Sequence, residues 1–181
     1  MRELADAERI RVFMRALGRT IDAPGRVYLT GGASAVLEGW RQSTIDVDIK
    51  PVPDSDAMLR AIPELKERLH LNVELASPDD FIPVRDGWPD RSPFIAREGR
   101  LDFHHFDFEA QALAKIERGH AADVGDVQAM IDRGLVDVDR LATAFREISA
   151  SLYRYPAVDP AAFSRSVEQT VADAKRRRGG R

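Results

Sequence analysis

Two carboxylates stand two residues apart in a short alternating segment. Residues 44–49 read Thr-Ile-Asp-Val-Asp-Ile, a pattern that predicts a strand with Asp46 and Asp48 on one face. Like charges placed this closely repel each other unless a cation lies between them. Mg²⁺ binds one or two carboxylates together with waters and substrate phosphates, and Mn²⁺ takes the same oxygen ligands. We therefore expect Asp46 and Asp48 to hold a divalent metal.

A glycine pair precedes the carboxylates by about a dozen residues. Gly31 and Gly32 follow a short apolar segment and precede a helical pattern, which places them at a strand-to-helix turn. Because glycine has no Cβ atom, such a turn lets backbone N–H groups approach a phosphate. Ser34 lies in the same segment and is a candidate for the same contact. A phosphate-binding turn beside metal-binding carboxylates is what a nucleoside triphosphate site requires.

Each motif has a plainer interpretation when it is taken alone. A glycine pair is usually a turn, and Asp-x-Asp on a strand is usually a solvated sheet face. Their order and separation favour a functional site. Thr44, two residues before Asp46, lies on the metal face and is either a phosphate contact or a site of self-modification.

The two motifs together resemble the signature of the nucleotidyltransferase superfamily: an apolar residue and two glycines, then Asp-apolar-Asp-apolar. Here they are residues 29–32 (Leu-Thr-Gly-Gly) and 46–49 (Asp-Val-Asp-Ile), and the intervening Thr30 is a departure from the pattern. The resemblance implies transfer of a nucleoside monophosphate from a nucleoside triphosphate to an acceptor hydroxyl. It also implies a third carboxylate on a neighbouring strand, as a metal ligand or general base. Glu74 is the first candidate and Asp102 the second.

A second segment resembles the Lys…Arg…Asp-x-x-Asp signature of the AbiEii/MenT-type toxin nucleotidyltransferases. It consists of Lys115, Arg118, Asp123 and Asp126, and residues 87–91 (Gly-Trp-Pro-Asp-Arg) resemble related uncharacterised bacterial proteins. The resemblance implies that Lys115 and Asp126 belong to the active site and that Arg118 helps to neutralise the triphosphate. The structural alternative is a salt-bridge network between two helices, from Lys115 or Arg118 to Asp126, and the two roles can coexist.

The toxin-like branch further implies an RNA acceptor, with tRNA foremost, and an antitoxin protein as partner. One rival hypothesis is a catalytically degenerate module of the same fold that binds a nucleotide or a partner. Another is a nucleic-acid-binding protein that depends on its basic C-terminus. Residues 175–181 carry five positive charges. The remainder of the chain therefore has a net charge of −8, and the two parts add up to the total of −3. The distribution of charge therefore leaves nucleic-acid binding open.

Composition excludes several other classes. The 181-residue chain has no cysteine, which excludes a disulfide scaffold and a cysteine nucleophile. No uncharged apolar segment approaches the roughly 18 residues that a membrane span needs, so we expect a cytoplasmic protein with no membrane partner. His104 and His105 are adjacent on an expected strand and face opposite sides, so they do not chelate one ion.

The elements that must position these residues predict an α+β fold. A small mixed sheet with flanking helices is expected over residues 1–106 as the nucleotidyltransferase core, with strands at 27–30, 45–50, 71–75 and 101–106. Residues 107–174 are expected to form a C-terminal helical bundle, and residues 175–181 a disordered basic tail. Four prolines between residues 77 and 100 predict irregular chain there.

Overall fold

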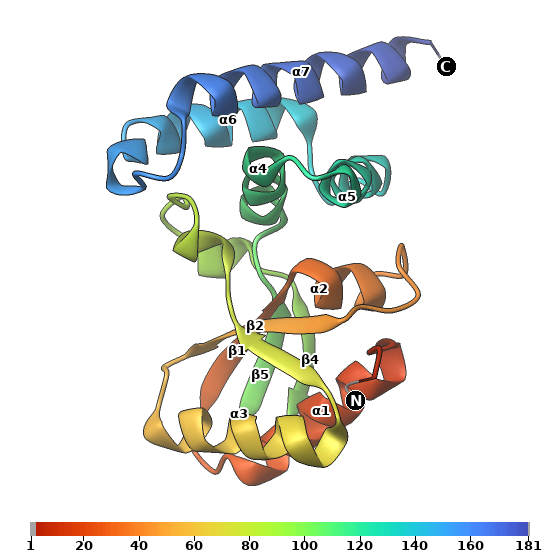
Figure 1. The fold of residues 1–181 in the computed structure, drawn as a ribbon, viewed down its shortest axis with the longest axis vertical. Helices are drawn as coiled ribbons and strands as arrows, with labels where there is room; N and C mark the ends of the chain where they lie inside the picture. The colour runs from red at the N-terminus through yellow and green to blue at the C-terminus, as the bar shows by residue number, and fades with distance from the viewer. Residues whose placement is uncertain (1–2, 181) are drawn as a thin grey trace. The chain divides into compact units, whose positions relative to one another are not determined.

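The computed structural model describes residues 3–180 and has the expected α+β architecture (Figure 1). The helices are α1 (Ala7–Thr20), α2 (Gly31–Leu37), α3 (Asp56–Leu69), α4 (Phe108–Arg118), α5 (Ala121–Asp132), α6 (Val138–Ser149) and α7 (Pro160–Gly179). The strands are β1 (Gly25–Thr30), β2 (Asp46–Val52), β3 (Asn72–Leu75), β4 (Phe94–Glu98) and β5 (Leu101–His105). Short 3₁₀ turns occupy Pro78–Asp80, Trp88–Arg91 and Leu152–Arg154.

The described chain divides into two compact units. The first comprises residues 3–77 and 90–106, and the second comprises residues 78–89 and 107–180. Residues 78–89, which the sequence placed in the region of the core, therefore pack with the helical part of the chain. Arg85 fixes this segment through salt bridges to Glu109 on α4 and Glu147 on α6, each at 2.6 Å.

The first unit is built on a five-stranded mixed sheet of order β3-β2-β1-β5-β4. The central strand β1 runs antiparallel to β2 and parallel to β5, while β3 is parallel to β2 and β4 is antiparallel to β5. The helices α1 and α3 pack against each other beside the sheet (Figure 1). Their apolar stripes form one core with the inward residues of the strands, among them Phe13, Leu17, Leu65, Val47, Ile49 and Phe103.

The alternating sequence of β2 sets the direction in which its carboxylates point. Val47 and Ile49 are buried in the core, at 0% and 1% exposure, while Asp46 and Asp48 between them are only half-buried. Because neighbouring residues of a strand point to opposite faces, the apolar pair fixes the direction of both carboxylates. The sequence-based prediction of one shared face for Asp46 and Asp48 is confirmed.

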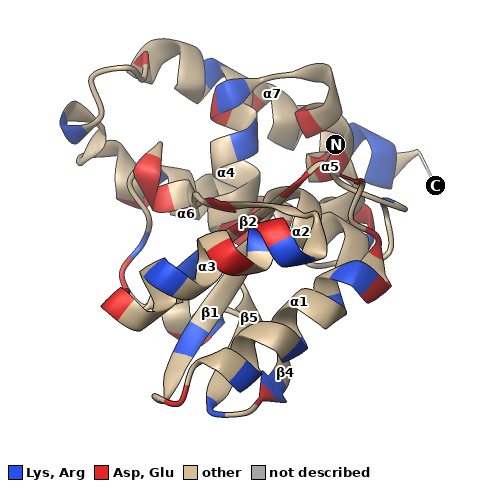
Figure 2. Ribbon diagram, turned by 60° about the horizontal axis from the view of Figure 1, so that its bottom comes forward, with Lys and Arg blue, Asp and Glu red and all other residues tan. Residues whose placement is uncertain are grey.

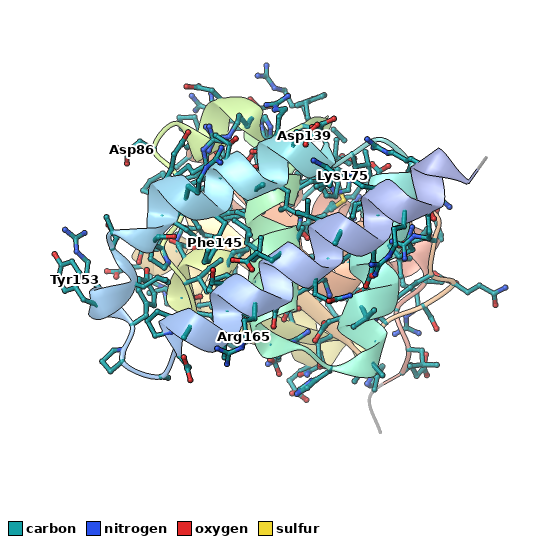
Figure 3. The ribbon with its side chains drawn as sticks, turned by 90° about the horizontal axis from the view of Figure 1, so that it is seen from above. Asp86, Asp139, Phe145, Tyr153, Arg165 and Lys175 are labelled. Carbon is teal, nitrogen blue, oxygen red and sulfur yellow. The ribbon has the colours of Figure 1, made fainter. Side chains whose placement is uncertain are left out.

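The second unit is a bundle of α4, α5, α6 and α7. Phe145 of α6 meets Phe163 of α7 edge to face, with ring centroids 4.8 Å apart (Figure 3). Asp107, Asp137 and Asp159 cap three of the helices by accepting backbone N–H groups of the first turn. These caps and the apolar stripes stabilise the helices of the bundle that was expected over residues 107–174.

The C-terminal basic segment differs from the prediction, because residues 175–179 continue α7 instead of forming a disordered tail. Ala174 is buried, and Lys175 Nζ lies 2.6 Å from Asp139 Oδ1 of α6 (Figure 3). The burial of Ala174 holds the helix at the start of the charged segment, and the exposed ion pair adds only a small stabilisation. Basic residues consequently gather on the last turns of α7 (Figure 2). Arg181 lies outside the described residues.

Candidate active site

The glycine pair and the carboxylates come from adjacent antiparallel strands. In the β1–β2 ladder, Thr30 is the partner of Asp48, and Gly31 begins α2 directly after Thr30. The end of β1 therefore lies beside the carboxylate-bearing part of β2. Sequence proximity did not require this pairing, but it brings the two predicted motifs together within one compact unit.

Contact between the motifs is tight enough to explain the glycines. Gly31 has φ +57°, and a Cβ atom added to it would lie 2.8 Å from Asp48 Oδ2. A Cβ atom added to Gly32 would lie 2.0 Å from Thr44 Oγ1. The space that side chains would fill at residues 31 and 32 is occupied by Asp48 and Thr44. Glycine at both positions thus lets this turn approach β2 without displacing Asp48 or Thr44.

The Asp46 carboxylate is held by the side-chain amide of Asn72. Asn72 of β3, the ladder partner of Asp46, donates to Asp46 Oδ1, and its Nδ2 also lies 2.9 Å from Glu74 Oε1. Asp46, Asp48, Asn72 and Glu74 are therefore neighbours on the same face of two parallel strands. This face carries oxygen ligands of the kind that hard divalent cations prefer.

Glu74 and Asp102 differ in their suitability as a third carboxylate. Glu74 is exposed and is the direct ladder partner of Asp48. Asp102 is the partner of Arg26, four residues from Thr30 along β1, or about 13 Å at the usual rise per residue. Arg97 forms two hydrogen bonds with Asp102, at 2.6 and 2.9 Å, and these lower the pKa of Asp102. Glu74 is thus the nearer of the two to Asp46 and Asp48, but among residues 3–180 no three His, Asp or Glu side chains are grouped closely enough to hold one metal ion.

The hydroxyl groups of Thr44 and Ser34, the two predicted phosphate contacts, both form hydrogen bonds within the first unit. Thr44 Oγ1 donates to the backbone oxygen of Asp46 at 3.0 Å, and the Thr44 side chain is almost fully buried. Ser34 has no exposed surface, and its Oγ lies 3.0 Å from Leu29 O and 2.9 Å from His105 Nδ1. The structure therefore places Ser34 beneath the glycine turn and Thr44 against its side.

Sequence reasoning missed His105 and Glu38. His105, at the end of β5, is 4% exposed, and its Nε2 lies 3.0 Å from Glu38 Oε1. Burial lowers the pKa of His105 to about 4, with a smaller effect from His104, so the ring is neutral near pH 7. Seventy-one residues separate Ser34 from His105, and no spacing motif links them.

The second predicted motif forms a buried ionic network in the helical unit. Lys115 Nζ on α4 lies 2.6 Å from Asp126 Oδ2 and 3.2 Å from Asp123 Oδ1, both on α5. Arg118 Nε donates to Asp123 Oδ2 at 2.8 Å. Lys115, Asp123 and Asp126 are all buried, whereas Arg118 is more than half exposed. The predicted salt-bridge network between two helices is confirmed, with Asp123 as an additional partner.

The charges of this network compensate one another. Burial by itself raises the pKa of Asp123, but hydrogen bonds from Arg118 and the charge of Lys115 outweigh burial and lower this pKa to about 2. Asp123 therefore stays ionised near neutral pH. Lys115 also lines a groove of about 580 Å³ together with residues of α5 and α7, including Gln128, Gln169 and Arg177.

Comparison with protein families assigns the chain. Residues 8–169 match the family described as a nucleotidyltransferase of unknown function (DUF6036). The chain belongs to this family. Membership in a nucleotidyltransferase family agrees with the glycine turn and the paired carboxylates that the fold brings together.

Other comparisons add little to the nucleotidyltransferase assignment. Neither the comparison with curated proteins nor that with solved structures found a match. The narrower likeness to AbiEii/MenT-type toxins therefore stays a prediction. Among residues 3–180, no helix of this nucleotidyltransferase-family chain is both long and apolar enough to cross a membrane.

Proposed function

We propose that this protein transfers a nucleoside monophosphate from a nucleoside triphosphate to an acceptor hydroxyl. The acceptor oxygen forms a bond to the α-phosphorus, the bond from that phosphorus to the α,β-bridging oxygen breaks, and pyrophosphate leaves. The proton of the acceptor hydroxyl passes to a carboxylate, for which Glu74 is the candidate. This proposal makes the polar face of β2 and β3, with the glycine turn, the catalytic surface.

One observation carries the proposal: the Asp48 carboxylate occupies the space of the absent Gly31 side chain. A plain turn and a solvated strand face would not need to meet. Their contact places backbone groups of the turn beside a carboxylate, so phosphate groups and their counter-ion can be bound at one place. Family membership supports the same chemistry.

The residues present fit a magnesium or manganese ion. Asp46 and Asp48 offer carboxylate oxygens on one face, and Mg²⁺ in proteins is commonly held by one or two carboxylates with waters and substrate phosphates. The bound ion would neutralise charge on the transferring phosphoryl group and on the pyrophosphate. Asn72 keeps Asp46 in place through its hydrogen bond to Oδ1.

The roles of Lys115, Arg118 and Asp126 in catalysis stay a prediction from the toxin-like resemblance. Their contacts support a structural role in joining α4 to α5. Replacing Lys115 by Gln separates the two roles. A catalytic lysine requires a loss of turnover in protein that is still folded, whereas a structural lysine requires a loss of stability with turnover retained in the folded fraction.

We propose RNA, with tRNA foremost, as the acceptor, and an antitoxin protein as the partner. The group of basic residues on the last turns of α7 supports the RNA acceptor, whereas the antitoxin follows only from the toxin-like resemblance. The test incubates the full chain with Mg²⁺ and each nucleoside triphosphate, together with total RNA, followed by mass spectrometry of RNA and protein. The proposal expects one nucleoside monophosphate added to RNA by the wild type and none by Asp46→Asn. If the nucleoside monophosphate were added to the protein alone, the RNA acceptor would be refuted and the reaction would be self-modification.

A second candidate is a nucleotide-binding module without catalysis. It is favoured by one observation: among residues 3–180, no three His, Asp or Glu side chains are grouped closely enough to hold a metal ion. Calorimetric titration with Mg²⁺ and a nucleoside triphosphate distinguishes the candidates. Binding without release of pyrophosphate, in the presence of RNA, would establish the module.

A further inference from the structure

His105 joins two turns of α2 to the end of β5. Ser34 and Glu38 are four residues apart and therefore lie on one side of the helix. His105 Nδ1 lies 2.9 Å from Ser34 Oγ, and Nε2 lies 3.0 Å from Glu38 Oε1. A single side chain thus contacts the second turn of α2 and its C-cap.

His105 adds to the packing of α2, in which Ala33, Ala35 and Val36 are buried. α2 has seven residues, a length at which an isolated helix is unstable in water. Its N-cap residue, Thr30, makes no side-chain hydrogen bond to the first turn. Gly31 and Gly32 at its start have no side chains to pack. The place of the glycine turn beside Asp48 therefore depends on the pairing of Thr30 with Asp48 and, in addition, on contacts made further along α2.

The direction of the hydrogen bonds follows from the chemistry of the groups. A carboxylate only accepts, so the proton in the contact with Glu38 is on Nε2 of His105. The Ser34 hydroxyl has a single proton, which it donates to Leu29 O at 3.0 Å, so its oxygen is the group that meets Nδ1 of His105. Each ring nitrogen therefore has a polar partner, which is why a histidine can be buried here.

A Ser–His–acid order also suggests a hydrolytic triad, but the burial argues against one. Ser34 has no exposed surface and sits within α2 beneath the turn. A nucleophile must reach its substrate, and this hydroxyl is enclosed. The arrangement is suited to holding α2 in place.

We propose that His105 is a positioning residue that holds α2, and with it the Gly31–Gly32 turn, against Asp48. The inference rests on the proposed function only where it concerns nucleotide binding. Its structural part concerns the ligand-free protein and can be tested separately. Ser34 is the more important contact, because it is three residues from Gly31, whereas Glu38 is at the far end of the helix.

Paired variants separate the two contacts. His105→Asn keeps a polar amide near the position of Nδ1, and Glu38→Gln keeps an acceptor for Nε2. His105→Gln keeps only the donor toward Glu38, and Ser34→Ala removes the hydroxyl. Amide hydrogen exchange of residues 29–37 is measured in each full-length variant, and exchange of residues 121–132 in α5 reports any general loss of stability.

We expect His105→Gln and Ser34→Ala to exchange about tenfold faster in residues 29–37, with α5 unchanged, and the two conservative variants to stay within twofold of the wild type. The KM for the Mg²⁺–nucleoside triphosphate complex rises at least fivefold in the first pair only. Unchanged exchange over residues 29–37 in both disruptive variants would overturn the proposal. So would faster exchange with an unchanged KM in an active protein. A wild type that neither binds nor turns over nucleotide refutes the proposed function, and the exchange data then decide the positioning role alone.

Discussion

Substitution of Gly31 by alanine tests the contact on which the candidate site depends. Gly31 has φ +57°, a conformation that costs a residue with a Cβ atom roughly 1–2 kcal/mol. Gly134 in the second unit has φ +72°, and a Cβ added there would meet nothing within 4 Å. Gly134→Ala therefore carries the same backbone strain without a contact and is the matched control.

The two variants should lose similar stability and differ in activity. For a chain of this size, 1–2 kcal/mol lowers Tm by roughly 2–8 °C. In Gly31→Ala, the new Cβ would lie 2.8 Å from Asp48 Oδ2, so the carboxylate must move by roughly 0.5 Å to restore an ordinary contact. Displacement on this scale at a catalytic group lowers turnover by roughly ten- to a hundredfold.

The assay combines thermal unfolding with transfer of α-phosphate label from a nucleoside triphosphate. We expect a turnover loss of that size in Gly31→Ala and less than a twofold change in Gly134→Ala. Equal transfer rates in the two variants would refute the claim that the glycine turn and Asp48 act together. If both variants lost transfer activity to the same extent, their loss of stability alone would account for the lower activity.

Three further predictions concern the neighbouring groups. Glu74→Gln should lower kcat at least about tenfold while KM for nucleotide changes little, since removal of a general base typically costs 10²–10⁴; an unchanged kcat rejects this base. Lys115→Ala should destabilise the protein by about 3–5 kcal/mol in urea unfolding, because it removes the buried cation that pairs with the buried Asp123 and Asp126, and the more exposed Arg118→Ala should cost less than half of that. Acid should act in two ranges. Between pH 6.5 and about 4, protonation of His105 only in the unfolded chain destabilises the fold, and His105→Asn flattens this slope. As the pH falls from about 4 to 2, the stabilisation from ionised Asp123 is lost, and Asp123→Asn removes that loss. Urea titrations across these pH values that give parallel slopes for variants and wild type would contradict both assignments.

Local patterns were sufficient where a residue's role is set by its immediate neighbours. The alternation around Asp46 and Asp48 predicted their shared face, because Val47 and Ile49 must be buried. The helical bundle expected over residues 107–174 is also present, and Asp159 with Pro160 begins its last helix, α7. In each of these elements, the hydrophobic pattern and the capping chemistry agree.

Long-range pairing accounts for what the sequence did not predict. β4 lies within the proline-containing segment that was expected to be irregular. Its burial pattern does not alternate, so no strand signal is present there. The strand forms because β5 pairs with it. The contact of His105 with Ser34 depends on the parallel pairing of β1 with β5, in which Leu29 faces His105. No local signal reports such a pairing.

The extension of α7 through residues 175–179 has a similar origin. Four consecutive basic residues, 175–178, favour a solvated end, but Asp139 on α6 supplies a partner for Lys175. An acidic residue 36 positions away gives no periodic signal in the sequence. Prediction therefore failed where a helix anchored by tertiary packing continues into a charged segment.

Release of pyrophosphate together with incorporation of the α-phosphate tests the central claim most directly. With Mg²⁺, a nucleoside triphosphate and RNA, the wild type should release one pyrophosphate for each labelled monophosphate incorporated. Asp46→Asn and Asp48→Asn should each lower both rates at least about a hundredfold while the circular dichroism and Tm stay close to those of the wild type. Transfer that persists when Asp46→Asn and Asp48→Asn are combined in one variant would contradict the account. So would nucleotide binding by the wild type with no pyrophosphate released.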